Sequence, residues 1–571
     1  MPTNPATSAA TLSKQLVYAS SLVYRIDIFL LLVILVFATF NAPRAISRFA
    51  HHSEWLQGHI LRSVKLTRKS RINLNTRSIY LHSDPQKIAL DLDDDRTDAM
   101  HLQSIPYLPP QSTHVDKELP PRPMSIVAPA STQRTWHMPM LSSLIHPVSS
   151  LLHKRMHENY SLGQVPLDGG IRGWVSTSQL PFIYVLATKN NVIGLLVGVG
   201  YEKLNYLHRF AGLFAVLAAN IHAIGYFYEW SITGTISMRL SNPHNLWGLV
   251  SLVCMDILGI FSMQLVRSKF YHFFLTTHVM GLILCNHHSV CIPYVTVACV
   301  FYGLDHLVRA IKTRIATATF RPIPELGLTR VEVPTVNAGW RAGQHVRLRV
   351  LSTAMGLLGM VEVHPFTIAS VSETEEGLVL LCKKTGKWTT KMYEMASTSA
   401  YGEQGQEVGR KIKVIVEGPY GGVCNTVIPS YSGAMFVVGG SGITFALSAV
   451  QDLVRSGESS SVTDIDVIWC IADPGLLIFL VYGIKVFYTR APTKSFDGVY
   501  LPPGITLVPG RPAFVKHLES LVHTTLSGGG RSGVFVGVCG PVSLAWNVCD
   551  TVRCFDPNLK RAVGGVELHE E

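Results

Sequence analysis

Long runs of apolar residues dominate the chain up to Ile311. They cover Leu22–Phe40, Leu180–Tyr201, Leu207–Tyr228, Leu246–Val266, Phe270–His288 and Ile292–Ile311. A helix that crosses a bilayer needs about 17–25 such residues, so the pattern predicts six membrane spans. The second run carries Lys189, Asn190 and Asn191 in its middle, which makes it the least typical of the six.

A polar stretch from Arg44 to Arg172 separates the first two runs. It contains an acidic run at Asp91–Asp95 and proline clusters at 109–110 and 120–123. It shows no sustained periodicity of apolar positions, so we expect a largely irregular loop.

The pattern changes after Phe320. Thr329–Val333 and His345–Leu351 are β-rich runs separated by turn residues, which predicts a small antiparallel β-barrel. From Ala434 onward, apolar strands alternate with helical stretches. That alternation predicts an α/β sheet.

Composition and charge support a membrane part joined to a soluble part. Charged residues make up only 15% of the chain, against about 25% in typical soluble domains. The net charge is +11, but the positive residues lie beside the apolar runs rather than in one dense cluster, so nucleic-acid binding is not predicted. The ten cysteines form no CxxC pair, which argues against a structural zinc site.

The charges next to the predicted spans indicate an orientation. They are Lys203 and Arg209, Arg267 and Lys269, and Arg309, Lys312 and Arg314. The positive-inside rule places all three groups on the cytoplasmic side. With six spans, both chain ends are then expected in the cytoplasm.

Histidines inside the predicted spans point to a metal centre. His208 and His222 lie fourteen residues apart on the third span, within about 40° of one helix face and about 21 Å apart along it. Imidazole is a common axial ligand of haem iron, and ionisable groups in a membrane are functional candidates. The fifth span offers His278, His287 and His288 as opposite ligands, although a hydrogen-bonded interior histidine is the alternative for any one of them.

The run from Tyr201 to Gly212 resembles the haem-span signature of fungal ferric-chelate reductases, in the ferric reductase and NADPH oxidase superfamily. Leu186–Asn191 and Tyr302–Arg309 are similar to neighbouring spans of that family. The resemblance implies two b-type haems, an inner one held by His208 and His278 and an outer one held by His222 and His288. His287 stays an alternative. The family spaces both pairs by fourteen, whereas the residue fourteen beyond His278 is Ile292. A local unwinding, a missing stretch of sequence or a lost outer haem would each explain this difference.

A second set of motifs suits a flavin. An aromatic ring can pack on the isoalloxazine, and hydroxyl or backbone donors can bind the ribityl and pyrophosphate oxygens. Such residue types occur in His364, Pro365, Phe366, Thr367 and Ile368, and this run resembles the family's FAD signature. Trp340–Val346 is similar to a preceding strand of the same barrel. By resemblance, Gly386, Trp388 and Thr389 lie in a phosphate loop.

A glycine-rich turn predicts the nicotinamide nucleotide site. It consists of Gly439, Gly440, Ser441, Gly442, Ile443 and Thr444, between a strand and a helix. Glycine lets the backbone approach a pyrophosphate at a helix N-terminus. The resemblance adds Cys539, Gly540 and Pro541 near the nicotinamide, and Arg490 and Arg511 near the phosphates. Ala472 stands where the family commonly has an arginine, so NADPH rather than NADH is expected from the family alone and NADH is not excluded.

Together these features predict a multi-pass α-helical membrane domain with a bis-haem bundle, a ferredoxin-reductase-like antiparallel β-barrel and an α/β nucleotide-binding domain. The expected regions are 1–45 (tail and first span), 46–171 (polar loop), 172–316 (haem domain), 317–430 (FAD barrel) and 431–571 (NAD(P)H domain).

The resemblance implies transmembrane electron transfer from NAD(P)H through FAD and haem to Fe(III) chelates for iron uptake, at the plasma membrane. No protein acid or base is needed at the acceptor, so no catalytic residue is named. Iron permease or oxidase partners follow from family analogy only. Two alternatives stay open: a superoxide-generating oxidase that uses O₂, and a non-catalytic relative with an incomplete outer haem site.

Overall fold

The computed structural model describes residues 5–65, 176–271, 273–275, 277–278, 292–398, 409–472, 484–488 and 505–571. The chain divides into two compact units. The first, called here the helical unit, comprises residues 1–60, 144–314 and 417–426. The second, called the sheet unit, comprises residues 61–143, 315–416 and 427–571.

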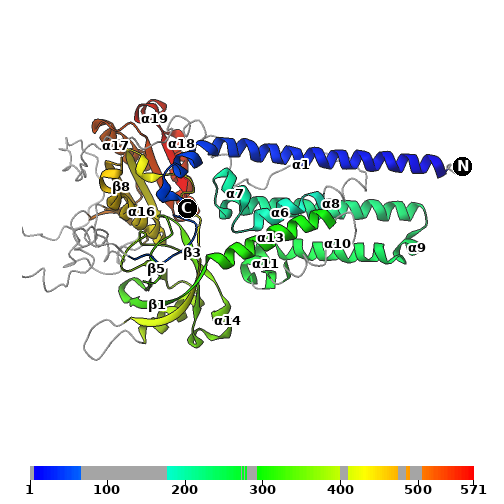
Figure 1. Ribbon diagram of the computed structural model, residues 1–571, viewed down its shortest axis with the longest axis horizontal. Helices are drawn as coiled ribbons and strands as arrows, with labels where there is room; N and C mark the ends of the chain where they lie inside the picture. The colour runs from blue at the N-terminus through cyan, green and yellow to red at the C-terminus, as the bar shows by residue number, and fades with distance from the viewer. Residues whose placement is uncertain are drawn as a thin grey trace, which may run out of the picture. The chain divides into compact units, whose positions relative to one another are not determined.

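The helical unit is built from long apolar helices (Figure 1). Its described helices are α1 (Pro5–Phe49), α6 (Leu180–Ala187), α7 (Val192–Val197), α8 (Tyr201–Ile232), α9 (Ile236–Leu240), α10 (Pro243–Phe261), α11 (Gln264–Lys269) and α13 (Ile292–Lys312). Four segments are long and apolar enough to cross a membrane: Tyr24–Phe49, α8, α10 and α13. Many of their large apolar side chains, such as Leu213 and Ile232, are exposed, as expected for helices solvated by lipid. These four coincide with predicted spans one, three, four and six.

The predicted second span differs from the structure. The predicted span over Leu180–Tyr201 consists of two separate helices, α6 and α7, which are interrupted at the polar residues Lys189, Asn190 and Asn191. The side chain of Asn191 accepts a hydrogen bond from the backbone N of Gly194 and caps α7. Asn190 donates from its backbone N and its side chain to Asp305 Oδ1, at 2.8 and 2.9 Å. These polar contacts replace the helical hydrogen bonds at the break. Of the predicted fifth span, residues 273–275 and 277–278 are helical, and the part from 279 lies outside the described residues.

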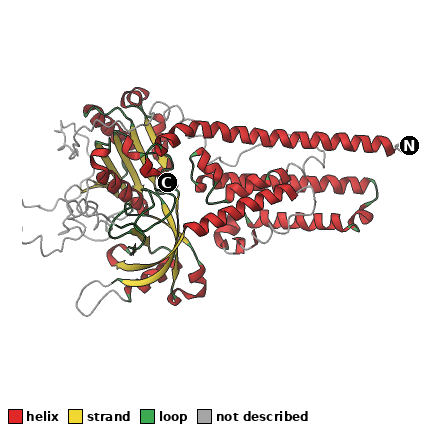
Figure 2. Ribbon diagram, in the orientation of Figure 1, coloured by secondary structure: helices red, strands yellow, loops and turns green. Residues whose placement is uncertain are grey.

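Polar side chains join the apolar helices to one another. Asn220 on α8 donates to Asp256 on α10 at 2.6 Å. Ser176 donates to the backbone oxygen of Ala215 on α8 at 3.0 Å. Helix α6 lies beside both α8 and α13, in the set of helices that Figure 2 draws in red. In lipid, such interhelical hydrogen bonds and close packing take the place of the hydrophobic effect.

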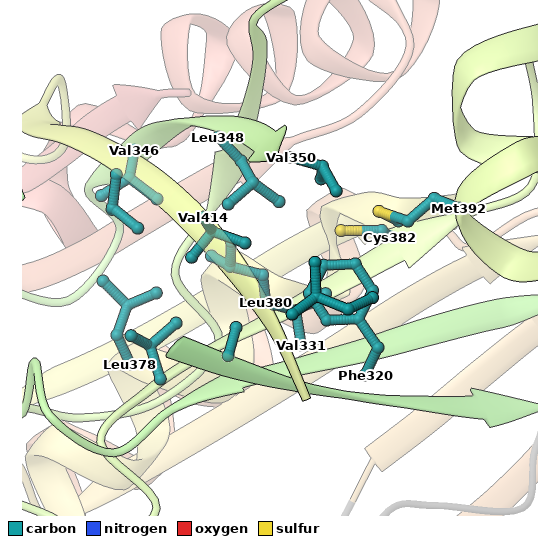
Figure 3. Close-up of a cluster of buried hydrophobic side chains, with 14 of the residues drawn as sticks. Phe320, Val331, Val346, Leu348, Val350, Leu378, Leu380, Cys382, Met392 and Val414 are labelled. Carbon is teal, nitrogen blue, oxygen red and sulfur yellow. The ribbon is translucent and has the colours of Figure 1, made fainter. Parts of the chain in front are cut away.

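The first part of the sheet unit is a six-stranded barrel. Its strands are β1 (Thr313–Ile323), β2 (Leu328–Val333), β3 (His345–Leu351), β4 (His364–Thr367), β5 (Leu378–Lys383) and β6 (Arg410–Tyr420), in the order β4-β3-β6-β1-β2-β5. The β1–β2, β2–β5 and β3–β4 pairs are antiparallel. An antiparallel bridge between Ile368 and Leu380 links the two ends of this order, which closes the sheet. Alternate side chains such as Phe320, Val346 and Leu380 fill the interior (Figure 3). The predicted antiparallel barrel is confirmed.

Residues before the barrel also contribute to it. Leu61 is fully buried in the barrel core, although the sequence placed it in the polar loop. Arg62 pairs with Ala338 through a backbone hydrogen bond of 2.8 Å. The side chain of Asn337 bonds both the N and the O of Val64. The predicted loop therefore begins later than expected, and its remainder from 66 to 171 lies outside the described residues.

The second part of the sheet unit is a parallel α/β sheet. Its strands are β7 (Gly433–Gly439), β8 (Asp464–Ile471), β9 (Ile484–Tyr488), β10 (Ile505–Pro509), β11 (Val534–Cys539) and β12 (Val566–Glu570), in the order β10-β9-β8-β7-β11-β12. The helices are α16 (Ile443–Ser456), α17 (Phe514–Ser527), α18 (Val542–Cys554) and α19 (Pro557–Val563). All registered pairs are parallel. The order reverses between β7 and β11, and ligands of open α/β sheets bind at the carboxyl ends of strands at such a reversal.

Candidate functional site

Two of the predicted haem ligands face each other inside the helical unit. The ring centroids of His208 on α8 and His278 are 6.2 Å apart, with the ring planes at 70°. An imidazole nitrogen binds a first-row metal at about 2 Å, so two imidazoles on opposite sides of one iron have centroids about 6 Å apart. The pair therefore fits the two axial ligands of one haem iron.

Hydrogen bonds to the two histidine rings determine which imidazole nitrogen can bind a metal. His208 Nδ1 lies 2.9 Å from the backbone oxygen of Ile183 on α6, and a carbonyl only accepts, so Nδ1 carries the proton. His208 Nε2 is then left with the lone pair that a metal needs. His278 Nδ1 lies 3.4 Å from Ser262 Oγ, which can orient that ring in the same way. The helix α6 thus takes part in the site even though it is too short to be one unbroken span.

The predicted outer pair is described on one side only. His222 lies on α8, and its ring is 4.8 Å from the ring of Tyr226. Its predicted partner His288, and the alternative His287, lie outside the described residues. The outer haem therefore stays a prediction.

Three aromatic rings meet at the predicted flavin site. The Trp388 ring, in α15 (Lys387–Ser397), lies 4.4 Å from the His364 ring and 6.2 Å from the Phe366 ring, nearly parallel to the latter at 27°. Trp388 Nε1 donates to the backbone oxygen of Gly359 at 2.9 Å, which fixes the indole. His364 and Phe366 are half-buried, so part of each ring is open to a flat ligand.

The other residues predicted to bind the flavin lie in the loop before α15, on strand β4 and in the barrel core. Thr389 Oγ1 accepts hydrogen bonds from the backbone N of Gly386 and of Thr385, at 3.0 and 3.1 Å. This contact shapes the loop before α15, where a Cβ on Gly386 would meet nothing within 4 Å. Pro365 and Thr367 lie on β4 beside Phe366. Ile368 is fully buried in the barrel core, so only its backbone is available to a ligand.

The two predicted nucleotide motifs lie together at the reversal of the parallel sheet. A Cβ on Gly442 would lie 2.4 Å from the backbone oxygen of Cys539, and one on Gly439 would lie 2.6 Å from Pro541 Cδ. Only glycine permits this approach of the two turns. Gly440 adopts a positive φ of 54°, and its carbonyl accepts a hydrogen bond from Trp469 Nε1 at 2.9 Å.

The rest of the nucleotide motif divides between buried and exposed positions. Ser441 continues the turn to the buried residues Ile443 and Thr444 at the start of α16. Arg511 is exposed just after β10. Arg490 lies outside the described residues.

The Cys539 thiol is expected to resist alkylation. Burial, together with the nearby charges of Glu571 and Glu570, raises the pKa of Cys539 to about 12. Because the thiolate is the reactive form, iodoacetamide at pH 8 should leave Cys539 unmodified and label the exposed Cys554 in the same sheet unit. Peptide mass spectrometry of the folded chain measures both sites. Equal labelling of the two cysteines would show that the turn around Cys539 is open to solvent.

The sequence did not reveal a polar network at the end of α13. Arg309 Nε and Nη2 donate to the two carboxylate oxygens of Glu417, at 3.0 and 3.3 Å. The hydroxyl of Tyr420 donates to Glu417 Oε1 at 2.9 Å. Burial, reinforced by the Glu417 charge, raises the pKa of Tyr420, so its phenol stays a neutral donor. Lys312 donates to the backbone oxygen of Pro419 at 3.4 Å.

These contacts belong to a larger attachment of residues Glu417–Thr426, called here the anchor segment. The guanidinium of Arg48 on α1 donates to the backbone oxygen of Cys424 and to Asn425 Oδ1, at 3.2 and 3.3 Å. Asn425 also donates to Asn41 on α1. The Tyr201 ring at the start of α8 lies 5.9 Å from the Tyr420 ring. Three membrane helices thus hold a segment that continues directly from barrel strand β6.

Comparisons with known proteins match two parts of the chain. Residues 172–286 match the family model "Ferric reductase like transmembrane component", and residues 323–423 match "FAD-binding domain". A probable cell surface ferric reductase, kap2, of Aspergillus oryzae is 26% identical over 375 residues, covering 59% of this chain and 48% of that protein. Ferric reductase transmembrane component 6 of Saccharomyces cerevisiae is 26% identical over 427 residues, covering 66% and 57%. The chain thus spans about half the length of these two relatives.

Among solved structures, a ferredoxin–NADP+ reductase from Plasmodium falciparum aligns with 45% of this chain and 96% of its own, at 13% identity and a TM-score of 0.28. This distant likeness adds nothing to the fold described above. The assignment rests on the two family matches, the fungal relatives and the apolar helices, which make the chain an integral membrane protein. Within the matched ranges, the chain is similar to the ferric reductases in its transmembrane part and to FAD-binding domains in the part that follows.

Proposed function

We propose that the chain transfers electrons from cytosolic NAD(P)H across the membrane to external Fe(III) chelates, with FAD and b-type haem as carriers. The observation that carries this proposal is the His208–His278 pair, whose 6.2 Å separation suits one iron. The pair occurs in a chain that also has an aromatic flavin site and a glycine-rich nucleotide turn. The relatives named above are called ferric reductases, which favours Fe(III) as the acceptor and iron uptake as the purpose.

Each carrier has its own residues in this proposal. Phe366 packs on the flavin ring and Trp388, buried in the barrel core, supports Phe366, while the loop at Gly386 and Thr389 holds the phosphates. The turn from Gly439 to Thr444 and the residues Cys539, Gly540 and Pro541 bind the nucleotide, with Arg490 and Arg511 near its phosphates. When bound, the flavin converts two-electron into one-electron chemistry, and haem carries single electrons.

The protein itself supplies positions and protonation states. The backbone oxygen of Ile183 keeps the His208 proton on Nδ1 and directs Nε2 inward. Because the pKa of Cys539 is raised, its side chain beside the nucleotide turn is a neutral thiol and not a thiolate. We place the chain in the plasma membrane with both ends cytoplasmic. In this orientation three groups of positive residues lie on the inner side: one in the first turns of α8, one between α10 and the fifth span, and one at the end of α13.

Spectra and turnover of the full chain in membranes test the proposal. We expect a reduced-minus-oxidised spectrum of b-type haem, and NAD(P)H-dependent reduction of Fe(III) that requires FAD. Running NADPH and NADH in parallel measures the nucleotide preference, and Cu(II) and O₂ measure the acceptor. Superoxide formation without iron reduction would favour an oxidase. A chain with no haem signal and no reduction would be a non-catalytic relative, and the proposal would be wrong.

A further inference from the structure

A short helix in the sheet unit presents large apolar side chains to its surroundings. Helix α14 (Gly356–Val361) joins β3 to β4. Leu357, Leu358 and Val361 are 82%, 83% and 69% exposed. Among the large hydrophobic residues that the structure describes, Leu357 and Leu358 are the most exposed, above any on the membrane helices. Contiguous exposed apolar residues on a soluble surface mark an interaction site.

The fold holds this helix firmly from below. Met355, directly before it, is fully buried in the barrel core, and Met360 packs against the same core. The carbonyl of Gly359 accepts the hydrogen bond from Trp388 Nε1. The two leucines therefore point outward because the inner side of α14 is fixed, not because the helix is detached from the barrel.

A positive side chain lies at the base of α14. Lys391 on α15 donates to the backbone oxygen of Met355, the residue directly before the helix, at 3.3 Å. Lys387, the first residue of α15, and Lys384, three residues earlier, are exposed as well. Exposed apolar side chains next to lysine are the arrangement with which interfacial segments bind a membrane that contains anionic lipid. The lysine stems can follow the apolar surface while their ammonium groups reach the phosphates.

The barrel follows a candidate membrane span directly in the chain. Strand β1 begins at Thr313, directly after α13 ends at Lys312, so no linker separates a candidate membrane span from the barrel. Ile315, two residues into the strand, is itself 74% exposed. A membrane surface is thus within reach of the sheet unit by connectivity alone.

We propose that α14 inserts Leu357, Leu358 and Val361 into the headgroup and acyl boundary of the leaflet in which α13 ends. Lys391, together with Lys384 and Lys387, binds anionic headgroups. Only two residues separate α14 from His364, the first residue of the strand that carries the predicted flavin aromatics. Lipid contact would therefore fix this strand relative to the membrane. The inference needs only a membrane-embedded chain and holds whatever acceptor the protein reduces.

Fluorescence quenching in nanodiscs tests this contact with the full chain. A fluorophore is attached to Leu358→Cys and, as the matched control, to Ser520→Cys, an exposed position on α17; the labelled parent chain corrects for native cysteines. In nanodiscs with anionic lipid, nitroxide-labelled lipid should quench the label at 358 at least about twofold more than at 520, and aqueous iodide should show the opposite order. Because Leu358 is exposed, the substitution leaves the barrel core intact.

Three outcomes would overturn the proposal. Equal iodide quenching at 358 and 520 would place α14 in water. Protection at 358 from both quenchers would mean that protein, a second copy or another chain, covers the helix. The lysines are expected to strengthen the contact, so lipid quenching at 358 should be weaker in neutral nanodiscs and weaker in Lys391→Gln. Lipid quenching that is the same in neutral and anionic nanodiscs, and unchanged by Lys391→Gln, would show that the lysines do not bind headgroups.

Discussion

Replacing His208 with alanine should remove the inner haem and stop electron flow to any external acceptor. The imidazole of His208 lies 6.2 Å from that of His278 between centroids, and Nδ1 is already bonded to Ile183. Alanine would remove one of the two imidazoles that would hold the haem iron, and no other histidine ring among the described residues lies against His278. We expect NAD(P)H-dependent Fe(III) reduction to fall by on the order of a hundredfold or more. The haem spectrum and the reduction rate measure this loss together.

The matched control is His306→Ala. His306 lies on α13, is exposed, and its Nδ1 contacts the backbone oxygen of Tyr302 within its own helix. This variant should keep the haem spectrum and most of the activity. In His208→Ala, direct reduction of ferricyanide from the flavin should persist, because the sheet unit contains neither histidine. A full inner-haem signal in His208→Ala would show that the ligand assignment is wrong.

Local patterns in the sequence were enough to predict the strands and turns of the sheet unit. Strand β7 is buried along its whole length and is nearly all apolar, which is typical of a central parallel strand. The glycines after it mark the turn to α16. The spacing of His208 and His222 is also local, since both lie on one helix. Such features depend on neighbours within one or two elements, and periodicity and turn chemistry report them directly.

Features set by distant contacts could not be predicted in this way. The break between α6 and α7 depends on Asp305, which is 115 residues from Asn190 in sequence. Hydropathy alone therefore suggested one continuous span. Leu61 lies in a short segment without periodicity, and only its place in the barrel core explains it. The ion pair of Glu417 with Arg309 joins residues 108 positions apart, and no local pattern reports it.

Breaking the Arg309–Glu417 pair should slow reduction of the haem without removing any cofactor. The pair is bidentate, and its side chains are only 25% and 14% exposed. In Arg309→Gln the Glu417 carboxylate stays half-buried with weaker hydrogen-bond donors. This lowers the free energy of unfolding by about 1–3 kcal/mol. Glu417 is itself a residue of strand β6, so we expect the loss of the pair to loosen the end of this strand. Stopped-flow reduction of the haem by NAD(P)H should become about tenfold slower under the proposed function.

A charge swap distinguishes positioning from simple damage. Glu417→Arg combined with Arg309→Glu keeps an ion pair of opposite polarity and should recover part of the rate that either single variant loses, as a double-mutant cycle measures. The control, Glu376→Gln, weakens the Arg330–Glu376 pair within the sheet unit, whose carboxylate side chain is 50% exposed. It should leave the rate unchanged, because such exposed pairs contribute little. Haem and FAD content should equal that of the parent in every variant. If Arg309→Gln keeps the full rate of haem reduction, the ion pair has no part in electron transfer, and its contacts serve only the stability of the helical unit.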